Sequence, residues 1–294
     1  MSVPPDDRKP RRFPLQLDQV ASPRAGGGRT PIGSTPAPRV SREVLRPQAP
    51  LHLAERDRQR YTAPQGLGLD SAHVRMRMVQ RLQAEGINHA GVLKAFATVP
   101  RHLFVDTALV NQAYEDTSLP IGLGQTISKP SVVAAMIQLL CVRPGLIQSD
   151  VPGVPGSTKP LGNCLEIGTG CGYQAALLSH LAREVYSIER LKGLHEKSRE
   201  NLRWFRLSNL HLLFGDGMLG YPKGAPYAAI IAAAGGNDIP QAWIDQLAVG
   251  GRLVAPAVTA AGRQNLVVVD KTATGIVRTE LEAVLFVPLK SGVA

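Results

Sequence analysis

A glycine-rich turn between two acidic residues is the part of this sequence best suited to chemistry. Residues 163–173 read as a buried strand, a Gly-x-Gly-x-Gly turn and the start of a helix, and Glu189 ends a second apolar run. Glycines in such a turn let the backbone approach a ligand, and an acid on the next strand can accept hydrogen bonds from ribose hydroxyls. The pattern indicates a site for a nucleotide-type cofactor.

Three interpretations of this turn remain open at this level. Tyr173 stands where a dinucleotide fingerprint would have its third glycine, which disfavours NAD or FAD. S-adenosylmethionine has no phosphate and carries a cationic sulfonium and an ammonium group, so Glu166, just before the turn, suits it. The third interpretation is an ordinary strand-to-helix turn without a ligand, and the acid at position 189 weakens it.

Alternating apolar runs predict the elements that would position the turn. We expect strands at 164–167, 185–189, 210–214, 228–232 and 252–257, and helices at 173–181, 191–205 and 240–247. Such alternation is typical of a Rossmann-like α/β fold, a doubly wound, mostly parallel sheet with helices on both faces. Two later β-rich runs, 265–269 and 281–287, predict a C-terminal antiparallel hairpin that closes the sheet.

The first half of the chain is expected to differ from this core. Residues 1–70 are rich in Pro, Arg and Gly and predict a disordered basic tail, because this composition buries little apolar surface. Residues 71–294 would form the folded domain, with a helical part at 71–142, a Pro/Gly/Ser linker at 143–163 and the α/β core at 164–294. Within the helical part, Ser131 is expected to cap a helix over 132–140.

Composition narrows the classes of partner. The tail contributes +5 of the formal net charge of +10, and no stripe of basic residues interleaved with aromatics occurs, so we expect no specific nucleic-acid partner. No apolar run reaches 18 residues and the N-terminus lacks a hydrophobic segment, so we expect no membrane association and a cytoplasmic location. Cys141, Cys164 and Cys171 lack zinc spacing, so we expect no metal.

Taken together, these residues resemble the protein-L-isoaspartate O-methyltransferase family, a class I S-adenosylmethionine-dependent family. The glycine turn alone would indicate only the class, whereas residues 124–128 (Gly-Gln-Thr-Ile-Ser) and 286–289 (Phe-Val-Pro-Leu) point to this family. The similarity covers most of residues 76–290. Its matching segments are 99–105, 114–116, 119–122, 124–128, 165–170, 185–190, 215–217, 250–254 and 286–289.

The resemblance implies methyl transfer from S-adenosylmethionine to the free α-carboxylate of isoaspartyl residues in damaged proteins and peptides. We expect the enzyme to be a monomer. A carboxylate is already ionised at pH 7, so no strong general base is required. Catalysis would rest on aligning the carboxylate oxygen with the methyl group, which can supply roughly 7 to 11 kcal/mol in the best cases.

The resemblance also implies roles for individual residues. Ser128 would be the catalytic residue and position the substrate carboxylate, while Val287 and Leu289 would lie beside the substrate peptide. Glu189 would bind the ribose, Asp216 with Gly217 the adenine side, and Glu166 with the turn the methionine moiety. The full set expected to bind the cofactor is Thr126, Ile127, Glu166, Gly168, Gly170, Cys171, Glu189, Arg190, Asp216 and Gly217.

Three positions depart from the family pattern. Lys129 stands where Gln is usual, Ser131 where an aromatic is usual, and Cys171 replaces a Ser in the glycine turn. Two alternatives therefore stay open: a related methyltransferase with another carboxylate or small-molecule acceptor, and an inactive cofactor-binding module that recruits partners through its tail.

Overall fold

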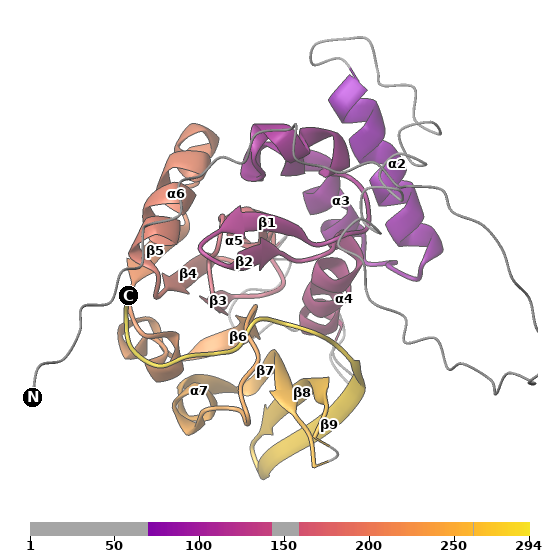
Figure 1. Cartoon of the computed structure of the whole chain (residues 1–294). Helices are drawn as coiled ribbons and strands as arrows, with labels where there is room; N and C mark the ends of the chain where they lie inside the picture. The colour runs from indigo at the N-terminus through magenta and orange to yellow at the C-terminus, as the bar shows by residue number, and fades with distance from the viewer. Residues whose placement is uncertain (1–69, 143–158, 261) are drawn as a thin grey trace, which may run out of the picture. The chain divides into compact units, whose positions relative to one another are not determined.

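A seven-stranded sheet is the centre of the computed structural model, which describes residues 70–142, 159–260 and 262–294 (Figure 1). The strand order is β5-β4-β3-β6-β7-β8-β9, with parallel pairs from β5 to β7 and antiparallel pairs from β7 to β9. The strands are β3 (Asn163–Ile167), β4 (Glu184–Glu189), β5 (Leu210–Phe214), β6 (Tyr227–Ala232), β7 (Leu247–Val258), β8 (Gln264–Thr272) and β9 (Gly275–Ala283). The predicted mostly parallel α/β sheet is confirmed.

Side chains of the central strands alternate between two hydrophobic cores, one on each face of the sheet. In β3, Cys164 joins one core, whereas Leu165 and Ile167 join the other. All three are essentially buried, as a strand covered on both faces requires. The first core contains buried residues of α2–α6, and the second contains Trp243 of α7. These helices are α2 (Asp70–Ala84), α3 (Ala90–Thr98), α4 (Pro130–Cys141), α5 (Tyr173–Ser179), α6 (Lys192–Leu202) and α7 (Gln241–Gln246).

Short 3-10 turns complete the connections between these elements. They are η2 (Arg101–Phe104), η3 (Thr107–Gln112), η4 (Arg203–Phe205), η5 (Gly217–Leu219) and η6 (Pro222–Gly224). Along the described ranges, no helix is both long enough and apolar enough to cross a membrane. The predicted tail at 1–70 and most of the linker at 143–163 lie outside the described residues, so the proposed domain boundaries stay predictions.

The prediction that Ser131 caps α4 is wrong. The helix begins at Pro130, and its N-cap is Lys129, which makes no side-chain capping bond. Proline suits this first position because it lacks the amide hydrogen that would have no helical partner there. The backbone amide and the hydroxyl of Ser131 instead donate to Asp116 at 2.8 and 2.7 Å.

The C-terminal hairpin is confirmed, but its second strand lies earlier than predicted. The prediction placed it at 281–287, whereas β9 spans Gly275–Ala283 and pairs with β8 through the tight turn after Thr272. β9 is an edge strand whose side chains are almost all exposed. It therefore lacks the alternation of apolar and polar residues that marks a half-buried strand.

A small hairpin lies within residues 71–142, the part of the chain predicted to be helical. β1 (Leu119–Gly122) and β2 (Gln125–Ile127) pair antiparallel, with Leu119 opposite Ile127. Leu123 and Gly124 between them have φ of +52° and +69°. The turn residues concealed the hairpin in the sequence, because its strands are only four and three residues long.

Candidate active site

The glycine turn leaves the carboxyl end of β3 in a backbone conformation that glycine adopts readily and other residues rarely do. φ is +89° at Gly168, +56° at Gly170 and +92° at Gly172. The Gly168 amide donates to the Ile188 carbonyl of β4 at 2.9 Å. The shape of the turn therefore requires these glycines, and the turn is attached to the neighbouring strand.

Glu189, the last residue of β4, holds this turn from the side. Its Oε2 accepts a hydrogen bond from the Gly170 amide at 2.8 Å, and its Oε1 accepts one from the Leu191 amide at 2.9 Å. Only 5% of the residue is exposed. Each carboxylate oxygen can accept more than one hydrogen bond, so Glu189 retains capacity for ligand hydroxyls.

Glu166 lies fully buried behind the turn rather than on its surface. Ser187 donates to Glu166 Oε2 and lies 2.6 Å from the Thr169 hydroxyl, so the three side chains form one chain of contacts. Burial raises the pKa of Glu166 to about 8, although Ser187 and the nearby Gln174 side chain oppose the rise. Its Oε1 has no hydrogen-bond partner within the described ranges. The carboxyl group is therefore largely protonated at neutral pH.

Asp216 and Gly217 follow β5, beside Glu189. The Asp216 carboxylate accepts from the Met218 amide at 2.9 Å and from the Gly292 amide at 2.6 Å. A Cβ at Gly217 would lie 2.6 Å from Ile167 Cγ2, so only glycine fits against β3 at this position. The carboxyl ends of β3, β4 and β5 thus bring the predicted cofactor residues together.

The last residues of the chain cross to the same place, as the yellow segment in Figure 1 shows. Arg190 Nε donates to the Gly292 carbonyl at 3.0 Å. The Ala294 amide donates to the Arg190 carbonyl at 2.8 Å, and the Lys192 amide donates to Ala294 at 2.7 Å. Sequence patterns did not reveal this contribution, because the bonds run through the backbone and a short polar segment carries no periodicity.

The β1–β2 hairpin packs on the other side of the glycine turn. A Cβ built at Gly170 would lie 3.2 Å from Ile121 Cδ1, so the turn and the hairpin are in close contact. Lys197 Nζ of α6 donates to the Ile121 carbonyl at 2.8 Å and fixes the hairpin from a second element. In β2, Thr126 is exposed, whereas Ile127 is only 5% exposed and joins the core.

Ser128 follows β2 directly and is partly buried. Its carbonyl accepts a hydrogen bond from Arg101 Nη2 at 2.9 Å. Its hydroxyl has no partner among the residues that the structure describes, so it remains available. The predicted catalytic residue is therefore held by its backbone, with its side chain uncommitted.

Val287 and Leu289 lie in the segment after β9 and pair with the backbone just after β6. The Gly235 amide donates to the Val287 carbonyl at 2.9 Å, and the Leu289 amide donates to the Gly235 carbonyl at 2.8 Å. Gly235 follows the carboxyl end of β6, the neighbour of β3 in the sheet. The segment is thereby anchored at the same sheet edge as the glycine turn.

Cys171 is a buried residue of the turn, 3% exposed. Burial raises the pKa of its thiol to about 11, so it is neutral at physiological pH. Its carbonyl accepts from Asn201 Nδ2 of α6 at 2.9 Å. Asn201, Thr169 and Ser187 also hold the turn and were not predicted. The available signal was a polar Ser187 inside the apolar run of β4.

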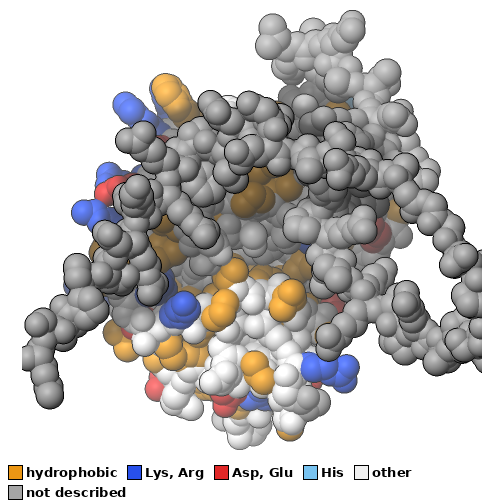
Figure 2. Space-filling view, viewed as in Figure 1, with side chains coloured by type: hydrophobic (Ala, Val, Ile, Leu, Met, Phe, Trp, Pro, Cys, Tyr) orange, Lys and Arg blue, Asp and Glu red, His pale blue; other side chains and the backbone are white. Residues whose placement is uncertain are grey.

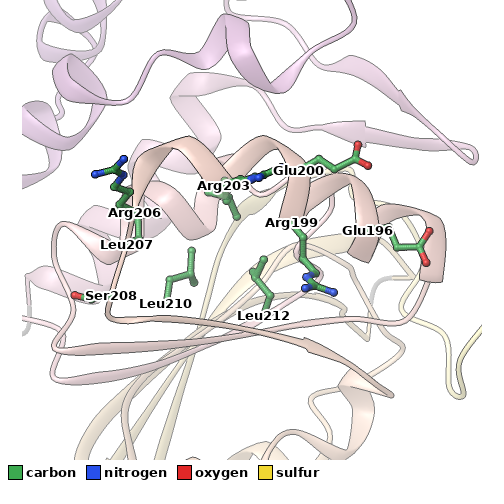
Figure 3. A pocket seen from close by; sticks show the side chains of 10 residues that line it. Glu196, Arg199, Glu200, Arg203, Arg206, Leu207, Ser208, Leu210 and Leu212 are labelled. Atoms are coloured by element: carbon green, nitrogen blue, oxygen red, sulfur yellow. The ribbon is translucent and has the colours of Figure 1, made fainter.

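An open groove of about 710 Å³ lies elsewhere, between α6 and β5 (Figure 3). It contains none of the predicted site residues. Charged side chains of both signs gather over α6 in Figure 2, and the groove has the same mixture. Its lining residues are Glu196, Arg199, Glu200, Leu202, Arg203, Arg206, Leu207, Ser208, Leu210 and Leu212. The predicted site residues lie at the carboxyl ends of β3–β6 and beside the β1–β2 hairpin, outside this groove.

Comparisons with known proteins show the family of the chain. Residues 73–294 match the family model described as Protein-L-isoaspartate(D-aspartate) O-methyltransferase (PCMT). A protein of Methylibium petroleiphilum named Protein-L-isoaspartate O-methyltransferase is 58% identical over 96% of this chain and 96% of its own length. One of Leptothrix cholodnii with the same name is 53% identical over 94% and 98%.

A solved structure titled as a protein-L-isoaspartate O-methyltransferase is also similar. It superposes with a TM-score of 0.63 and 25% identity, covering 74% of this chain and 67% of that one. The family model covers about three quarters of the chain, and the first two relatives cover nearly all of it. The resemblance seen in the sequence is thus confirmed, and the chain belongs to the protein-L-isoaspartate(D-aspartate) O-methyltransferase family.

Proposed function

We propose that this chain is an enzyme that transfers a methyl group from S-adenosyl-L-methionine to the free α-carboxylate of L-isoaspartyl residues in damaged proteins and peptides. The observation that carries the proposal is the contact between the glycine turn and the β1–β2 hairpin, at Gly170 and Ile121. This contact supports a site in which the proposed cofactor residues of the sheet adjoin the loop that bears Ser128. Membership of the family supports the same activity.

The residues at the sheet edge suit this cofactor. Gly168 and Gly170 leave the backbone open to the methionine moiety, and the Glu189 oxygens can accept from ribose hydroxyls. Asp216 and Gly217 would take the adenine side. Thr126, Ile127, Cys171 and Arg190 complete the proposed cofactor set. When bound, the cofactor supplies an electrophilic methyl group on a sulfonium.

Glu166 has a more indirect role in this proposal. It holds Thr169 through Ser187 and so supports the shape of the turn. Because burial raises the pKa of Glu166, its carboxyl group is largely protonated at neutral pH. The cationic groups of the cofactor would favour its ionisation, because an opposite charge stabilises the carboxylate. Cofactor binding and deprotonation of Glu166 would then reinforce each other.

The acceptor needs alignment rather than activation. Its carboxylate is ionised at neutral pH and can attack the methyl carbon without a general base. The uncommitted Ser128 hydroxyl would donate to one carboxylate oxygen and direct the other toward the methyl group. Val287 and Leu289 would lie along the substrate peptide, which suits an enzyme that reads mainly the damaged linkage.

The experiment that tests the proposal measures transfer of labelled methyl to matched isoaspartyl and aspartyl peptides. Wild type should methylate only the isoaspartyl peptide, and Ser128→Ala should lose about 100- to 1000-fold in kcat, the range for one hydrogen-bond donor in an active site. Thr107→Ala, on η3, is a matched hydroxyl removal outside the site. Cofactor binding without transfer to either peptide would contradict the proposal. It would leave two alternatives: a methyltransferase with another acceptor, or an inactive cofactor-binding module.

We further propose that the enzyme acts as a cytoplasmic monomer without specific nucleic-acid contacts. The mixed charge over α6 supports the absence of specific nucleic-acid contacts, since nucleic-acid binding usually needs a surface of mainly positive charge. Light scattering of the purified full chain tests the monomer. Retention of the full chain on immobilised DNA or RNA at physiological salt would contradict the proposed absence of nucleic-acid contacts.

A further inference from the structure

Arg101 is a cation buried completely, with 0% of its surface exposed. Its Nη2 donates to the Ser128 carbonyl at 2.9 Å and, more weakly, to the Thr117 carbonyl at 3.4 Å. The guanidinium carbon lies 5.0 Å from the centre of the Tyr173 ring, a cation–π distance. Tyr173 is the first residue of α5, directly after the glycine turn.

This burial is costly for the protein. Nε and Nη1 of Arg101 have no hydrogen-bond partner in the described part of the chain, and none of the ion pairs between described residues includes this arginine. The charge of Asp116 favours the Arg101 cation, although the two side chains form no ion pair. A buried cation without an ion-paired carboxylate loses several kcal/mol of hydration, and an apolar residue of similar volume is often neutral or better for stability. Stability alone therefore does not explain an arginine here.

The location of Arg101 offers another reason. Arg101 contacts the loop that carries Ser128, the proposed catalytic residue. It also contacts Tyr173, at the start of the helix that follows the glycine turn. Asp116 fixes the first turn of α4, which follows this loop directly, through Ser131. Arg101 thus holds Ser128, and Asp116 holds Ser131. Of Arg101 and Asp116, Arg101 also makes a cation–π contact with Tyr173.

We propose that Arg101 is a positioning residue for methyl transfer, which sets the Ser128 loop relative to the glycine turn. The inference rests on the proposed function. Because methyl transfer requires an in-line approach, a displacement of Ser128 by about 1 Å can cost up to about 100-fold in rate. Apart from Thr126 and Ile127, the proposed cofactor residues lie outside the Ser128 loop, so cofactor binding should be affected little.

Two variants of Arg101 separate positioning from folding. Arg101→Lys keeps a charge but cannot reach both the Ser128 carbonyl and the Tyr173 face with a planar group. Arg101→Met removes the buried charge and retains an unbranched side chain. For each variant we would measure the unfolding temperature, the Kd for S-adenosylhomocysteine, and kcat and KM for an isoaspartyl peptide.

Arg252 supplies the matched control. It is also buried, at 5% exposed, and donates to two carbonyls, of Leu139 and Val142, but it pairs with Asp270 away from the site. Arg252→Lys should lower the unfolding temperature and leave kcat unchanged when assayed below that temperature. A role in structure alone predicts the same for Arg101.

The expected result is a fall in kcat of about 10- to 100-fold in both Arg101 variants, with KM and the cofactor Kd changed by less than about threefold. Arg101→Met should remain folded even if Arg101→Lys does not. If kcat of the Arg101 variants equals that of Arg252→Lys, the inference is overturned while the proposed function stands. A wild type inactive on isoaspartyl peptide would overturn both.

Discussion

The Gly292 amide donates a hydrogen bond of 2.6 Å to the Asp216 carboxylate, joining the end of the chain to the residue after β5. Arg190 donates to the carbonyl of the same glycine. Both partners belong to the proposed cofactor set. The terminal segment thereby fixes two side chains that would face the adenosine.

Deletion of residues 291–294 should therefore weaken cofactor binding. The side chains of Asp216 and Arg190 would lose one hydrogen bond each, and the Arg190 carbonyl would lose a third. At about 0.5 to 1.5 kcal/mol for one bond, the Kd for S-adenosylhomocysteine should rise about 3- to 10-fold. Isothermal titration calorimetry measures this change. Val293→Ala is the control, because its side chain is 54% exposed and the contacts are made by the backbone. Equal affinity in the truncated protein would contradict the prediction.

A second prediction concerns the pH dependence of stability. The pKa of Glu166 is about 8 in the folded protein against 4.5 as its ordinary value. Below pH 4.5 both states hold the proton, and between pH 4.5 and 8 only the folded state holds it. The free energy of unfolding should therefore fall as pH rises through this window, by up to about 1.4 kcal/mol per pH unit from this group, and level off above pH 8.

Glu166→Gln tests this dependence, since the amide cannot ionise. Between pH 5 and 8, wild type should lose stability relative to Glu166→Gln in urea unfolding. Glu200→Gln, an exposed change on α6, should follow the wild-type curve. Parallel curves for wild type and Glu166→Gln would show that the buried carboxyl does not titrate in this range.

Several parts of the fold could be predicted because they depend on local patterns. β3, β4 and β5 are apolar runs that end at Gly or at an acid, and their helices follow with ordinary spacing. β9 was misplaced because an exposed edge strand has no apolar face, and β1–β2 was hidden by its short strands.

The site was predictable only in part. Glu189 and the glycines could be recognised from their positions at strand ends. The contact from Arg101 to the Ser128 carbonyl, in contrast, joins residues 27 positions apart. Gly292 meets Asp216 across 76 positions through a backbone amide. Such contacts depend on tertiary structure, and no local spacing encodes them.

Cys171 should be unreactive despite its place in the active-site turn. Thiolates, not thiols, react with alkylating reagents, and burial holds the pKa of this thiol near 11. Native protein treated with iodoacetamide at pH 7.5 should show negligible modification of the Cys171 peptide by mass spectrometry. The same peptide should be modified fully in urea, which serves as the control. Rapid labelling of Cys171 in the native protein would contradict the assignment.

Two glycines after β5 offer a test of how tightly the adenine side is packed. A Cβ at Gly217 would lie 2.6 Å from Ile167 Cγ2, too close for any side chain, whereas at Gly215 the nearest atom is Ile188 Cγ2 at 3.8 Å, an ordinary contact. Gly217→Ala should therefore cost about 1 to 3 kcal/mol of stability, because the added methyl displaces β3 under the glycine turn.

The same displacement should weaken binding of S-adenosylhomocysteine, since Ile167 directly precedes Gly168 in the turn. Gly215→Ala should stay within about 0.5 kcal/mol of wild type, as a substitution without a clash does, and should bind the cofactor normally. Thermal unfolding and calorimetry on the two variants compare one methyl group at positions two residues apart. Equal effects of the two substitutions would mean that the backbone after β5 yields easily, and that close packing against β3 does not hold Gly217 in the proposed site.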